Sequence, residues 1–458
     1  MIESKLLSFN EFNITFKHNN TCEAIAKITT KFSELKHEEI QDIYDSEYLS
    51  VTRKGIKTVG ILQPIVHTGG TARVAVLLIS LWLRLGFKVI LFTENNCSIS
   101  YSISESVTQV IIPKVRDKSN YCDVLERCKC VRSLLIKFNI DVFVSNRDSS
   151  LYDLLCIKTI GIPYLIIQHN PFILNMLRFP QDQGLYQLTD MVITLTEKDK
   201  VYCNMLGINS AYIPNPIDEA LVSAPLCNLD SKNIIWVGRL HPTEKRPGDA
   251  LDVINKIIKE IPMAKLYMLG TSGSDQFDKH FEKIINQKRL VNSVVWTGFQ
   301  PNVYAFYQNS SVLLMTSAFE SYSMVAMEAM AFGLPCVTYE MPDLIYNHRD
   351  GGAVLVRQRD VVGAADMIIN LFRDKKQHQK LSNDAKASFN NLKKIDTGVL
   401  WIETFDKVLG TNRRQPIVPI SNINFSEIIN TINYYHNYEM NRNLYESNYN
   451  VNGIKWSV

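Results

Sequence analysis

The sequence predicts an α/β protein built from two Rossmann-like, doubly wound domains. Its 458 residues exceed the ~250 to 300 residues at which a single hydrophobic core stops growing. Short apolar runs of strand length alternate with longer segments of helical periodicity, first from about residue 57 and again from about residue 234, which is the order of parallel βαβ units. Between the two series, the polar, proline-containing segment 223–232 is interpreted as a linker.

Composition and charge exclude several classes of protein. Hydrophobic residues make up 46% and charged residues 21% of the chain, which is typical of globular proteins and excludes disorder for most of it. The 49 basic and 46 acidic residues nearly balance, so no nucleic-acid partner is expected. The nine cysteines are dispersed without a CxxC pair, which argues against a disulfide scaffold or zinc ribbon and favours a reducing compartment.

The sequence also predicts a cytoplasmic location. The N-terminal residues lack the apolar stretch and cleavage site of a signal peptide. The most apolar long window, 74–92, contains Arg84 and Lys88, so no membrane-spanning helix is expected. The apolar segment Phe172–Phe179 leaves contact with a lipid-linked acceptor or the inner face of a membrane open, but a buried helix is the favoured interpretation.

We expect four regions along the chain. Residues 1–50 are interpreted as a helical extension, 51–222 as an N-terminal Rossmann-like domain, and 223–400 as a C-terminal Rossmann-like domain. Residues 401–458 are expected to form a closing helix and an Asn- and Tyr-rich tail that packs back toward the N-terminal domain, or that mediates homo-oligomer formation.

Apolar runs and breaker residues give the elements of each domain. In the N-terminal domain they are a strand from Val59, a Gly69–Gly70 loop, a helix at Ala72–Leu85, strands at Val89–Phe92, Val110–Ile112, Val142–Ser145, Tyr164–Ile167 and Met191–Leu195, and a helix at Val124–Phe138. In the C-terminal domain they are strands at Ile234–Val237, Leu266–Leu269, Val294–Trp296, Val312–Met315 and Cys336–Tyr339, and helices at Ala250–Glu260, Phe277–Ile285, Met324–Phe332, Val361–Leu371 and Leu400–Leu409.

The densest polar signal lies where a strand of the C-terminal domain runs into a helix. Glu320 comes just before this helix and Glu328 lies inside it. Free amides at a helix N-terminus favour phosphate, and open α/β sheets bind ligands beyond the carboxyl ends of their strands. We therefore expect the amides of residues 322–325 to bind phosphate and Glu328 to accept hydrogen bonds from ribose hydroxyls. The structural alternative is a capped surface helix with a solvated glutamate.

Three further groups follow predicted strands. Arg239 and Lys245 lie after the first strand of the C-terminal domain and are expected to converge on one anion, unless they are simply solvated. Gly69 and Gly70 allow close approach of a ligand before a helix, although neither G-x-G-x-x-G nor a Walker loop is present. His169 ends a buried strand, where a structural role is the alternative. The chain has no D-x-D motif and its histidines are dispersed, so no metal cofactor is expected.

These motifs together resemble a known family. The segment with Glu320 and Glu328, followed by Gly333-Leu-Pro, and the Gly238-Arg-Leu motif with Lys245 are similar to those of the retaining glycosyltransferases of family 4 (glycosyl transferase group 1), which have the GT-B fold. The resemblance spans about residues 57–410. The other matching features are Gly69-Gly70 with Arg73, His169, Ile213-Pro-Asn-Pro-Ile-Asp218 and Asp350-Gly-Gly352.

The resemblance implies a fold, substrates and residue roles. Its two domains face a central cleft, with the acceptor on the N-terminal domain and the nucleotide sugar on the C-terminal one. The implied catalytic residues are His169, beside the anomeric centre, Arg239 and Lys245, which stabilise the leaving diphosphate in place of a metal, and Glu320, at the sugar hydroxyls. The implied donor-binding residues are Gly69, Gly70, Arg239, Lys245, Ser321, Tyr322, Ser323, Met324, Val325 and Glu328.

The implied reaction is metal-independent transfer with retention from a nucleotide diphosphate sugar, with UDP favoured by family frequency, to a hydroxyl of a glycan, glycolipid or lipid-linked acceptor. Two residues depart from the family pattern: Arg246, before Pro247, replaces the usual glycine after the lysine, and Ala72 replaces the usual acidic residue before Arg73. The alternatives are a GT-B nucleotide-sugar epimerase, which needs no acceptor, and a non-catalytic binding or chaperone subunit.

Overall fold

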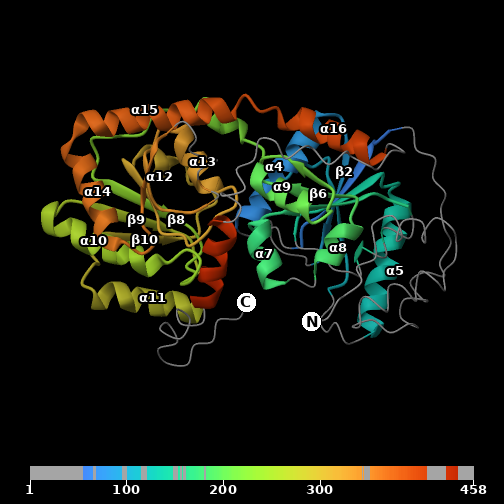
Figure 1. The fold of residues 1–458 in the computed structure, drawn as a ribbon, viewed down its shortest axis with the longest axis horizontal. Coiled ribbons are helices and arrows are strands. Elements are labelled where there is room, and N and C mark those ends of the chain that lie inside the picture. The colour runs from blue at the N-terminus through green and yellow to red at the C-terminus, as the bar shows by residue number, and fades with distance from the viewer. Residues whose placement is uncertain are drawn as a thin grey trace. The chain divides into compact units, whose positions relative to one another are not determined.

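A computed structural model of the chain describes residues 55–64, 69–94, 101–114, 121–147, 153–154, 157, 161–179, 182–342, 344, 351–409 and 430–441. The predicted extension 1–50 lies outside these residues. Contacts divide the chain into two units (Figure 1). The N-terminal unit comprises Met1–Pro216 and Thr397–Ile428, and the C-terminal unit comprises Ile217–Asp396 and Ile429–Val458.

The N-terminal unit contains a parallel sheet of seven strands in the order β3-β2-β1-β4-β5-β6-β7. Its strands are β1 (Thr58–Leu62), β2 (Lys88–Thr93), β3 (Thr108–Ile111), β4 (Val142–Ser145), β5 (Tyr164–Gln168), β6 (Met191–Thr194) and β7 (Ser210–Tyr212). Its helices are α4 (Gly70–Arg84), α5 (Tyr121–Lys137), α7 (Phe172–Arg178), α8 (Gln183–Leu188), α9 (Glu197–Met205) and α16 (Thr397–Leu409).

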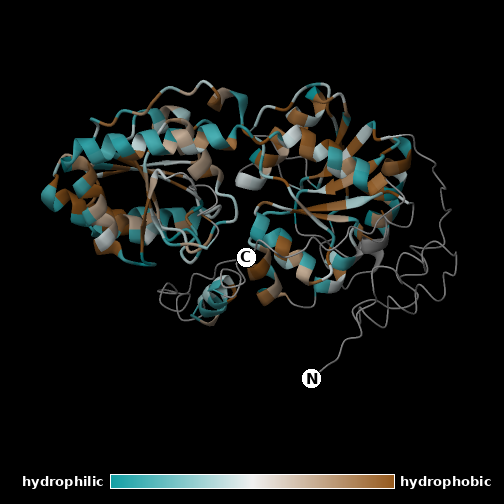
Figure 2. Cartoon of the chain, turned by 45° about the horizontal axis from the view of Figure 1, so that its top comes forward, coloured by the Kyte–Doolittle hydropathy of each residue, from teal (hydrophilic) through white to brown (hydrophobic). Residues whose placement is uncertain are grey.

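Burial explains why these strands form. Every residue of β1, β4, β5 and β6 is buried, as expected for strands of a parallel sheet that is covered on both faces. Hydrophobic residues accordingly concentrate in the strands of this unit (Figure 2). The favoured interpretation of the apolar segment after His169 is confirmed: α7 is a helix whose residues from Phe172 to Met176 are all buried.

The C-terminal unit contains a parallel sheet of six strands in the order β10-β9-β8-β11-β12-β13. Its strands are β8 (Asn233–Val237), β9 (Lys265–Leu269), β10 (Val294–Gly298), β11 (Val312–Met315), β12 (Cys336–Tyr339) and β13 (Ala353–Val356). Its helices are η2 (Glu219–Leu221), α10 (Pro247–Glu260), α11 (Asp275–Gln287), α12 (Tyr304–Gln308), α13 (Met324–Ala331), α14 (Val361–Arg373), α15 (Lys375–Leu392) and a helix at 430–441.

Helices pack on both faces of this sheet. Side chains of α10, α11 and α14 join those of the strands in one core that includes Trp236 and Tyr339, while α13 packs against α15. Figure 1 shows α15 on one side of the sheet and α10 with α11 on the other. The predicted fold class, two doubly wound α/β domains, is confirmed.

The sequence did not predict α15 because its buried residues are small or polar. The residues buried along this helix are His378, Ser382, Ala385, Ser388 and Phe389, and Leu381 is partly buried against the core. Most residues on the buried face of α15 are polar or small, so this face does not appear as a hydrophobic periodicity in the sequence.

The boundary between the units lies earlier than the predicted one. Contacts place it after Pro216 rather than after residue 222, and the predicted linker packs on the C-terminal unit. The amide of Cys227 donates to the carbonyl of Phe332 at 2.8 Å, and that of Asn228 donates to the carbonyl of Gln308 at 2.9 Å. A polar, proline-containing sequence marks the lack of regular secondary structure, but backbone hydrogen bonds to helix ends hold this segment in place.

The end of the chain also differs from the prediction. The closing helix α16 does pack on the N-terminal unit, where Trp401 lies 5.0 Å from Trp82 between ring centroids. Helix 430–441, the described part of the tail, belongs instead to the C-terminal unit. Its residue Tyr438 contacts Phe319 with ring centroids 5.5 Å apart. The tail's aromatic residues thus have partners on this unit, which composition alone did not specify.

Two glycines bring the backbones after β8 and β9 into contact. Gly270 has a φ of +130°, and a Cβ atom on it would lie 2.0 Å from the carbonyl oxygen of Gly238. Gly270 also donates its amide to Gly298 at 2.7 Å. The backbone after β9 therefore contacts the backbones after β8 and at the end of β10, and position 270 has no room for a side chain.

We expect Gly270→Ala to lower the free energy of unfolding of the C-terminal unit by about 3 kcal/mol or more, because steric overlap adds to backbone strain. Gly273→Ala is the matched control. Gly273 has a φ of +81° with nothing within 4 Å of its Cβ position, so strain alone should cost about 1 to 2 kcal/mol. Urea unfolding of both variants measures the difference; equal losses would contradict the close approach.

Candidate active site

The candidate site of the C-terminal unit lies on two loops that leave neighbouring strands. The β8 loop (residues 238–246) follows β8, and the β11 loop (residues 316–323) follows β11; these strands pair in parallel. Chain connectivity reverses direction between them in the order β10-β9-β8-β11-β12-β13. This is the switch point of the sheet, beyond which doubly wound folds bind their ligands.

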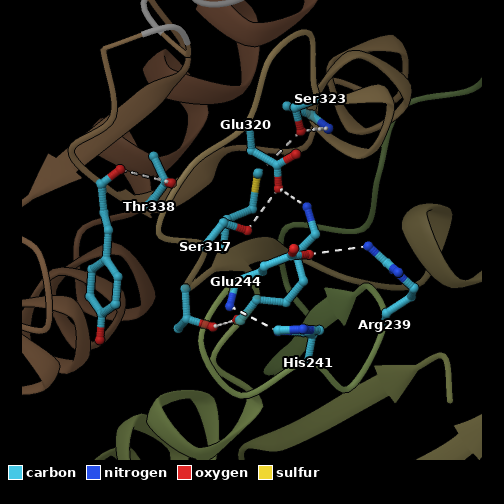
Figure 3. A network of polar contacts seen from close by, with 12 residues as sticks. Arg239, His241, Glu244, Ser317, Glu320, Ser323 and Thr338 are labelled. Carbon is cyan, nitrogen blue, oxygen red and sulfur yellow. Dashed lines mark hydrogen bonds and ion pairs between the residues drawn. The ribbon is translucent and has the colours of Figure 1, made fainter. Parts of the chain in front are cut away.

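Lys245 and Glu320 form the central pair of the site. The Nζ atom of Lys245 lies 2.6 Å from Oε1 of Glu320, and their side chains are 22% and 14% exposed. Ser317 donates its hydroxyl to the same carboxylate oxygen at 2.7 Å (Figure 3). The carboxylate is thus oriented by one cation and one hydroxyl, a charge-assisted arrangement that is stronger than neutral hydrogen bonds.

Thr316 and Ala318 join the two loops behind this pair. The hydroxyl of Thr316 accepts a hydrogen bond from Nε1 of Trp236 at 2.9 Å and donates one to the carbonyl of Lys245 at 2.7 Å. The amide of Ala318 donates to the carbonyl of Glu244 at 2.7 Å. Because these bonds are buried or nearly so, they fix the backbone on both sides of Lys245 relative to the β11 loop.

Arg239 takes a more open position. Its side chain is 65% exposed and forms an ion pair with Glu244, at 3.1 Å (Figure 3). The backbone amide of Glu244 in turn donates to Nδ1 of His241 at 3.2 Å. Arg239 and Lys245 therefore pair with different carboxylates here, and their convergence on one anion stays a prediction.

The structure shows how Arg246 is accommodated where the family has a glycine. This residue has a φ of +48°, in the left-handed region that a glycine enters most readily. Its side chain is buried and donates to Gln358, which donates to the carbonyls of Ser317 at 3.3 Å and Glu340 at 2.7 Å. Burial lowers the pKa of Arg246. Pro247, which follows, begins α10, where its missing amide hydrogen costs no helical hydrogen bond.

The N-terminus of α13 carries the predicted phosphate-binding residues. Ser323 is the cap, with a φ of +49°, and its hydroxyl accepts from the amide of Ala326 at 3.3 Å. Ser321 and Tyr322 are buried beside it, while Met324 and Val325 are partly exposed. Among the described residues, the Ser321 hydroxyl is one of the few buried polar atoms without a hydrogen-bond partner.

Glu328 is buried inside α13 rather than solvated. It is 4% exposed and accepts a hydrogen bond from the hydroxyl of Tyr307, in α12, at 3.1 Å. The alternative of a solvated surface glutamate is therefore wrong. A buried carboxylate needs hydrogen-bonding partners, and the Tyr307 hydroxyl orients this one. The binding of Glu328 to ribose stays a prediction.

The N-terminal unit has a second candidate group at its own switch point. His169 follows β5, and its Nε2 lies 2.8 Å from Oδ1 of Asn146, which follows β4. Nδ2 of Asn146 donates to Oε1 of Gln63 at 2.7 Å and to the carbonyl of Thr71 at 2.8 Å. Because Nδ2 of Asn146 donates to these two acceptors, Oδ1 of Asn146 accepts the hydrogen bond from His169. Nε2 of the neutral imidazole therefore carries the proton, and Nδ1 carries the lone pair.

The electrostatics of His169 follow from its surroundings. Burial lowers its pKa from the ordinary value of 6.5 to about 4, because removal from water disfavours the charged imidazolium. The imidazole is therefore neutral at pH 7. Gly69, with a φ of +99°, is the cap of α4, and Gly70 is its first residue, so the predicted glycine loop does adjoin a helix N-terminus.

A buried ion network lies further along this edge. Arg127, 2% exposed, donates to Asp153 at 2.8 Å and to Glu94, after β2, at 2.8 Å. Arg147, after β4, lies 3.2 Å from the same Glu94. Neither arginine was predicted as functional, because the four charges come from separate stretches of sequence and only the fold assembles them.

Sequence reasoning also missed the polar partners of the site, among them Asn146, Thr316, Tyr307 and Gln358. Asn146 could have been found from its place after a buried strand, as His169 was. Among the described residues, no group of three His, Cys, Asp or Glu side chains is arranged to hold a metal ion. In the same residues no helix has the length and apolar character needed to cross a bilayer.

Two family models match the chain. The model described as Glycosyltransferase Family 4 matches residues 68–221, and the model described as Glycosyl transferases group 1 matches residues 231–374. Together they cover more than half of the chain and both candidate groups. The chain belongs to the family 4 glycosyltransferases. It is accordingly a glycosyltransferase enzyme, so the non-catalytic alternative is not supported.

Curated relatives agree with this family. The chain is 24% identical to an uncharacterized glycosyltransferase of Haemophilus influenzae over 69% of this chain and 91% of that protein. It is 32% identical to the poly(glycerol-phosphate) alpha-glucosyltransferase of Bacillus subtilis over 38% of this chain and 25% of that protein. A lipopolysaccharide 1,6-galactosyltransferase of Escherichia coli is 32% identical over 29% of this chain and 36% of that protein.

Solved structures show the GT-B fold class. TarM of S. aureus, in a complex that contains UDP, is similar with a TM-score of 0.64 and 12% identity, covering 78% of this chain and 100% of that chain. HepE of Anabaena, in complex with UDP and glucose, is similar with a TM-score of 0.63 and 14% identity, with the same coverage. At these identities the likeness concerns the fold alone.

We expect histidine NMR to show His169 as the neutral Nε2–H tautomer down to about pH 5, with protonation only near pH 4. The His169→Gln variant assigns its resonance. Since the unfolded chain protonates near its ordinary value of 6.5, the unfolded state binds more protons as pH falls, and the N-terminal unit should lose stability between about pH 6.5 and pH 4. A ring that titrates near 6.5 in the folded protein would contradict the burial.

Proposed function

We propose that this glycosyltransferase acts in polysaccharide or glycoconjugate biosynthesis and takes its sugar from a nucleotide diphosphate sugar, with UDP as the favoured carrier. The observation that carries the proposal is the Lys245–Glu320 pair, held at 2.6 Å on loops at the switch point. A fixed cation beside an oriented carboxylate suits a donor with an anionic diphosphate and sugar hydroxyls. Relatives named for glucosyl and galactosyl transfer, and similar structures solved with UDP, support the same donor class.

The donor would be held mainly by the C-terminal unit. Amides of residues 322–325 and the helix dipole of α13 would bind the diphosphate, with the unpartnered hydroxyl of Ser321 as a further donor. Glu328, oriented by Tyr307, would accept hydrogen bonds from the ribose. Glu320 would accept hydrogen bonds from the hydroxyls of the transferred sugar. Gly69 and Gly70, at the N-terminus of α4, would add backbone donors for the diphosphate.

The proposed reaction is transfer with retention and without a metal. The bond between the anomeric carbon and the diphosphate oxygen breaks, and the acceptor oxygen bonds to that carbon on the same face. The acceptor's hydroxyl proton passes to a phosphate oxygen of the departing nucleotide. Lys245 and Arg239 would stabilise the charge that develops on the diphosphate, because prepositioned cations act most strongly where charge appears in the transition state.

On the N-terminal unit, His169 is the proposed contact for the acceptor and the reacting sugar. Its neutral imidazole, with the lone pair on Nδ1, can accept a hydrogen bond from a hydroxyl without placing a second cation near the anomeric carbon. A glycan or lipid-linked acceptor, a cytoplasmic location, contact with a membrane surface and homo-oligomer formation stay predictions of the sequence.

A donor panel tests this function. We expect the purified protein to release UDP from one UDP-sugar only when an acceptor hydroxyl is present, to give NMR spectra in which the product keeps the donor's anomeric configuration, and to retain activity in EDTA. Acceptor-independent release of an altered sugar would instead identify the epimerase. An inverted product would contradict retention, and loss of activity in EDTA would contradict metal independence.

We expect Lys245→Ala and Arg239→Ala each to lower kcat by about 10²-fold or more, the usual loss when one transition-state donor is removed. Lys288→Ala is the matched control, because Lys288 forms a pair of the same 2.6 Å length with Asp252 on α10. This control should keep wild-type kcat. Steady-state kinetics with the UDP-sugar identified in the donor panel measure all three variants. Wild-type kcat in both site variants would contradict the roles assigned to Lys245 and Arg239.

A further inference from the structure

Helix 430–441 packs against both loops that carry the candidate donor site. The hydroxyl of Tyr434 donates a hydrogen bond to the carbonyl of Ala318, in the β11 loop. The hydroxyl of Tyr438 lies 3.5 Å from the carbonyl of Thr243, in the β8 loop. The helix is the unlabelled red one in Figure 1.

Aromatic rings take part in this contact. Tyr438 meets Phe319 edge to face, with ring centroids 5.5 Å apart. Tyr435 is fully buried and packs edge to face against Tyr434 at 5.3 Å. Such pairs add about 0.5 to 1.5 kcal/mol each beyond the area they bury. The contact of Tyr438 with Phe319 therefore joins the helix to the β11 loop, and the Tyr434–Tyr435 contact stiffens the helix itself.

The contacted residues adjoin the central pair. Ala318 and Phe319 separate Ser317 from Glu320, and Thr243 precedes Glu244, whose carbonyl accepts the amide of Ala318. The helix thus touches the backbone on each side of the hydrogen bond that joins the loops.

We propose that helix 430–441 is a positioning element of the donor site, which acts through the two loops to hold Lys245 and Glu320 in register. The proposal rests on the proposed function for its kinetic effect, since it takes this pair as the donor contact. Misplacement of a catalytic group by about 1 Å can cost about 10²-fold in rate, so a helix that fixes loop backbone can affect turnover without touching substrate.

This element lies outside the segments that the family models match. The family models match residues 68–221 and 231–374, so the helix lies outside both. Its tyrosines at 434 and 438 also lie near the buried guanidinium of Arg246. The arginine in place of the usual glycine and helix 430–441 therefore lie on the same loop.

Three variants of the full chain test the proposal. We expect Tyr438→Ala to lower kcat by about tenfold or more per binding-competent molecule, and Tyr438→Phe, which keeps the ring on Phe319, to stay within about threefold of wild type. Met440→Ala, at a position 67% exposed on the same helix, should leave kcat and KM unchanged. Calorimetric titration with UDP counts the binding-competent molecules. Expressing kcat per competent molecule separates a loss of folded protein from a loss of rate.

Hydrogen exchange of the substrate-free protein gives a second readout. We expect Tyr438→Ala to raise the exchange rate of the Ala318 and Lys245 amides, which donate to Glu244 and His241, while Met440→Ala does not. If wild-type protein transfers no sugar from any donor, the proposed function fails, and exchange alone then decides for or against positioning. Wild-type kinetics per competent molecule in Tyr438→Ala, or unchanged exchange in both loops, would overturn the proposal. Should Tyr438→Ala fail to fold, Tyr434→Phe, which removes only one hydroxyl, takes its place with the same two readouts.

Discussion

The candidate site depends on one constraint, the attachment of the β8 loop to the β11 loop. Strands β8 and β11 are neighbours in a parallel sheet, so their loops emerge side by side, but adjacency alone leaves loops free to move. The hydroxyl of Thr316 removes that freedom by bonding to both Trp236 and the backbone of Lys245. Lys245 then reaches Glu320 from a fixed base, which is the condition for electrostatic preorganisation.

Positive charge in the C-terminal unit is distributed according to what each side chain does. Arg239 is exposed and paired with Glu244, Lys245 is mostly buried and paired with Glu320, and Arg246 is buried with a lowered pKa. Three basic residues within one loop thus have three environments. A net charge of only +3 for the whole chain is compatible with local recognition of an anion, because the loop and the α13 N-terminus supply the field where it is needed.

Strand and helix positions near the site could be predicted because buried strands and glycine or proline breakers leave clear patterns. The strands β4, β11 and β12 were predicted with the bounds they have. Prediction failed for side chains whose role depends on a partner far along the chain. Asn146 orients His169, Tyr307 orients Glu328, and the tail tyrosines pack on the C-terminal unit, and none of these pairs shares a local motif. Helix α15 was missed, and residues 223–232 were interpreted as a linker, because their polar sequences do not show the distant partners on which they pack.

The contact between Gly238 and Gly270 limits how this enzyme can change its substrate. Where β8 and β9 end, the backbone of Gly270 approaches that of Gly238 so closely that position 270 has no room for a side chain. Any side chain at position 270 must first push these two backbones apart. Variation in the sugar or carrier that such a scaffold accepts must therefore arise from side chains on other segments, and engineering of donor choice is best directed away from these glycines.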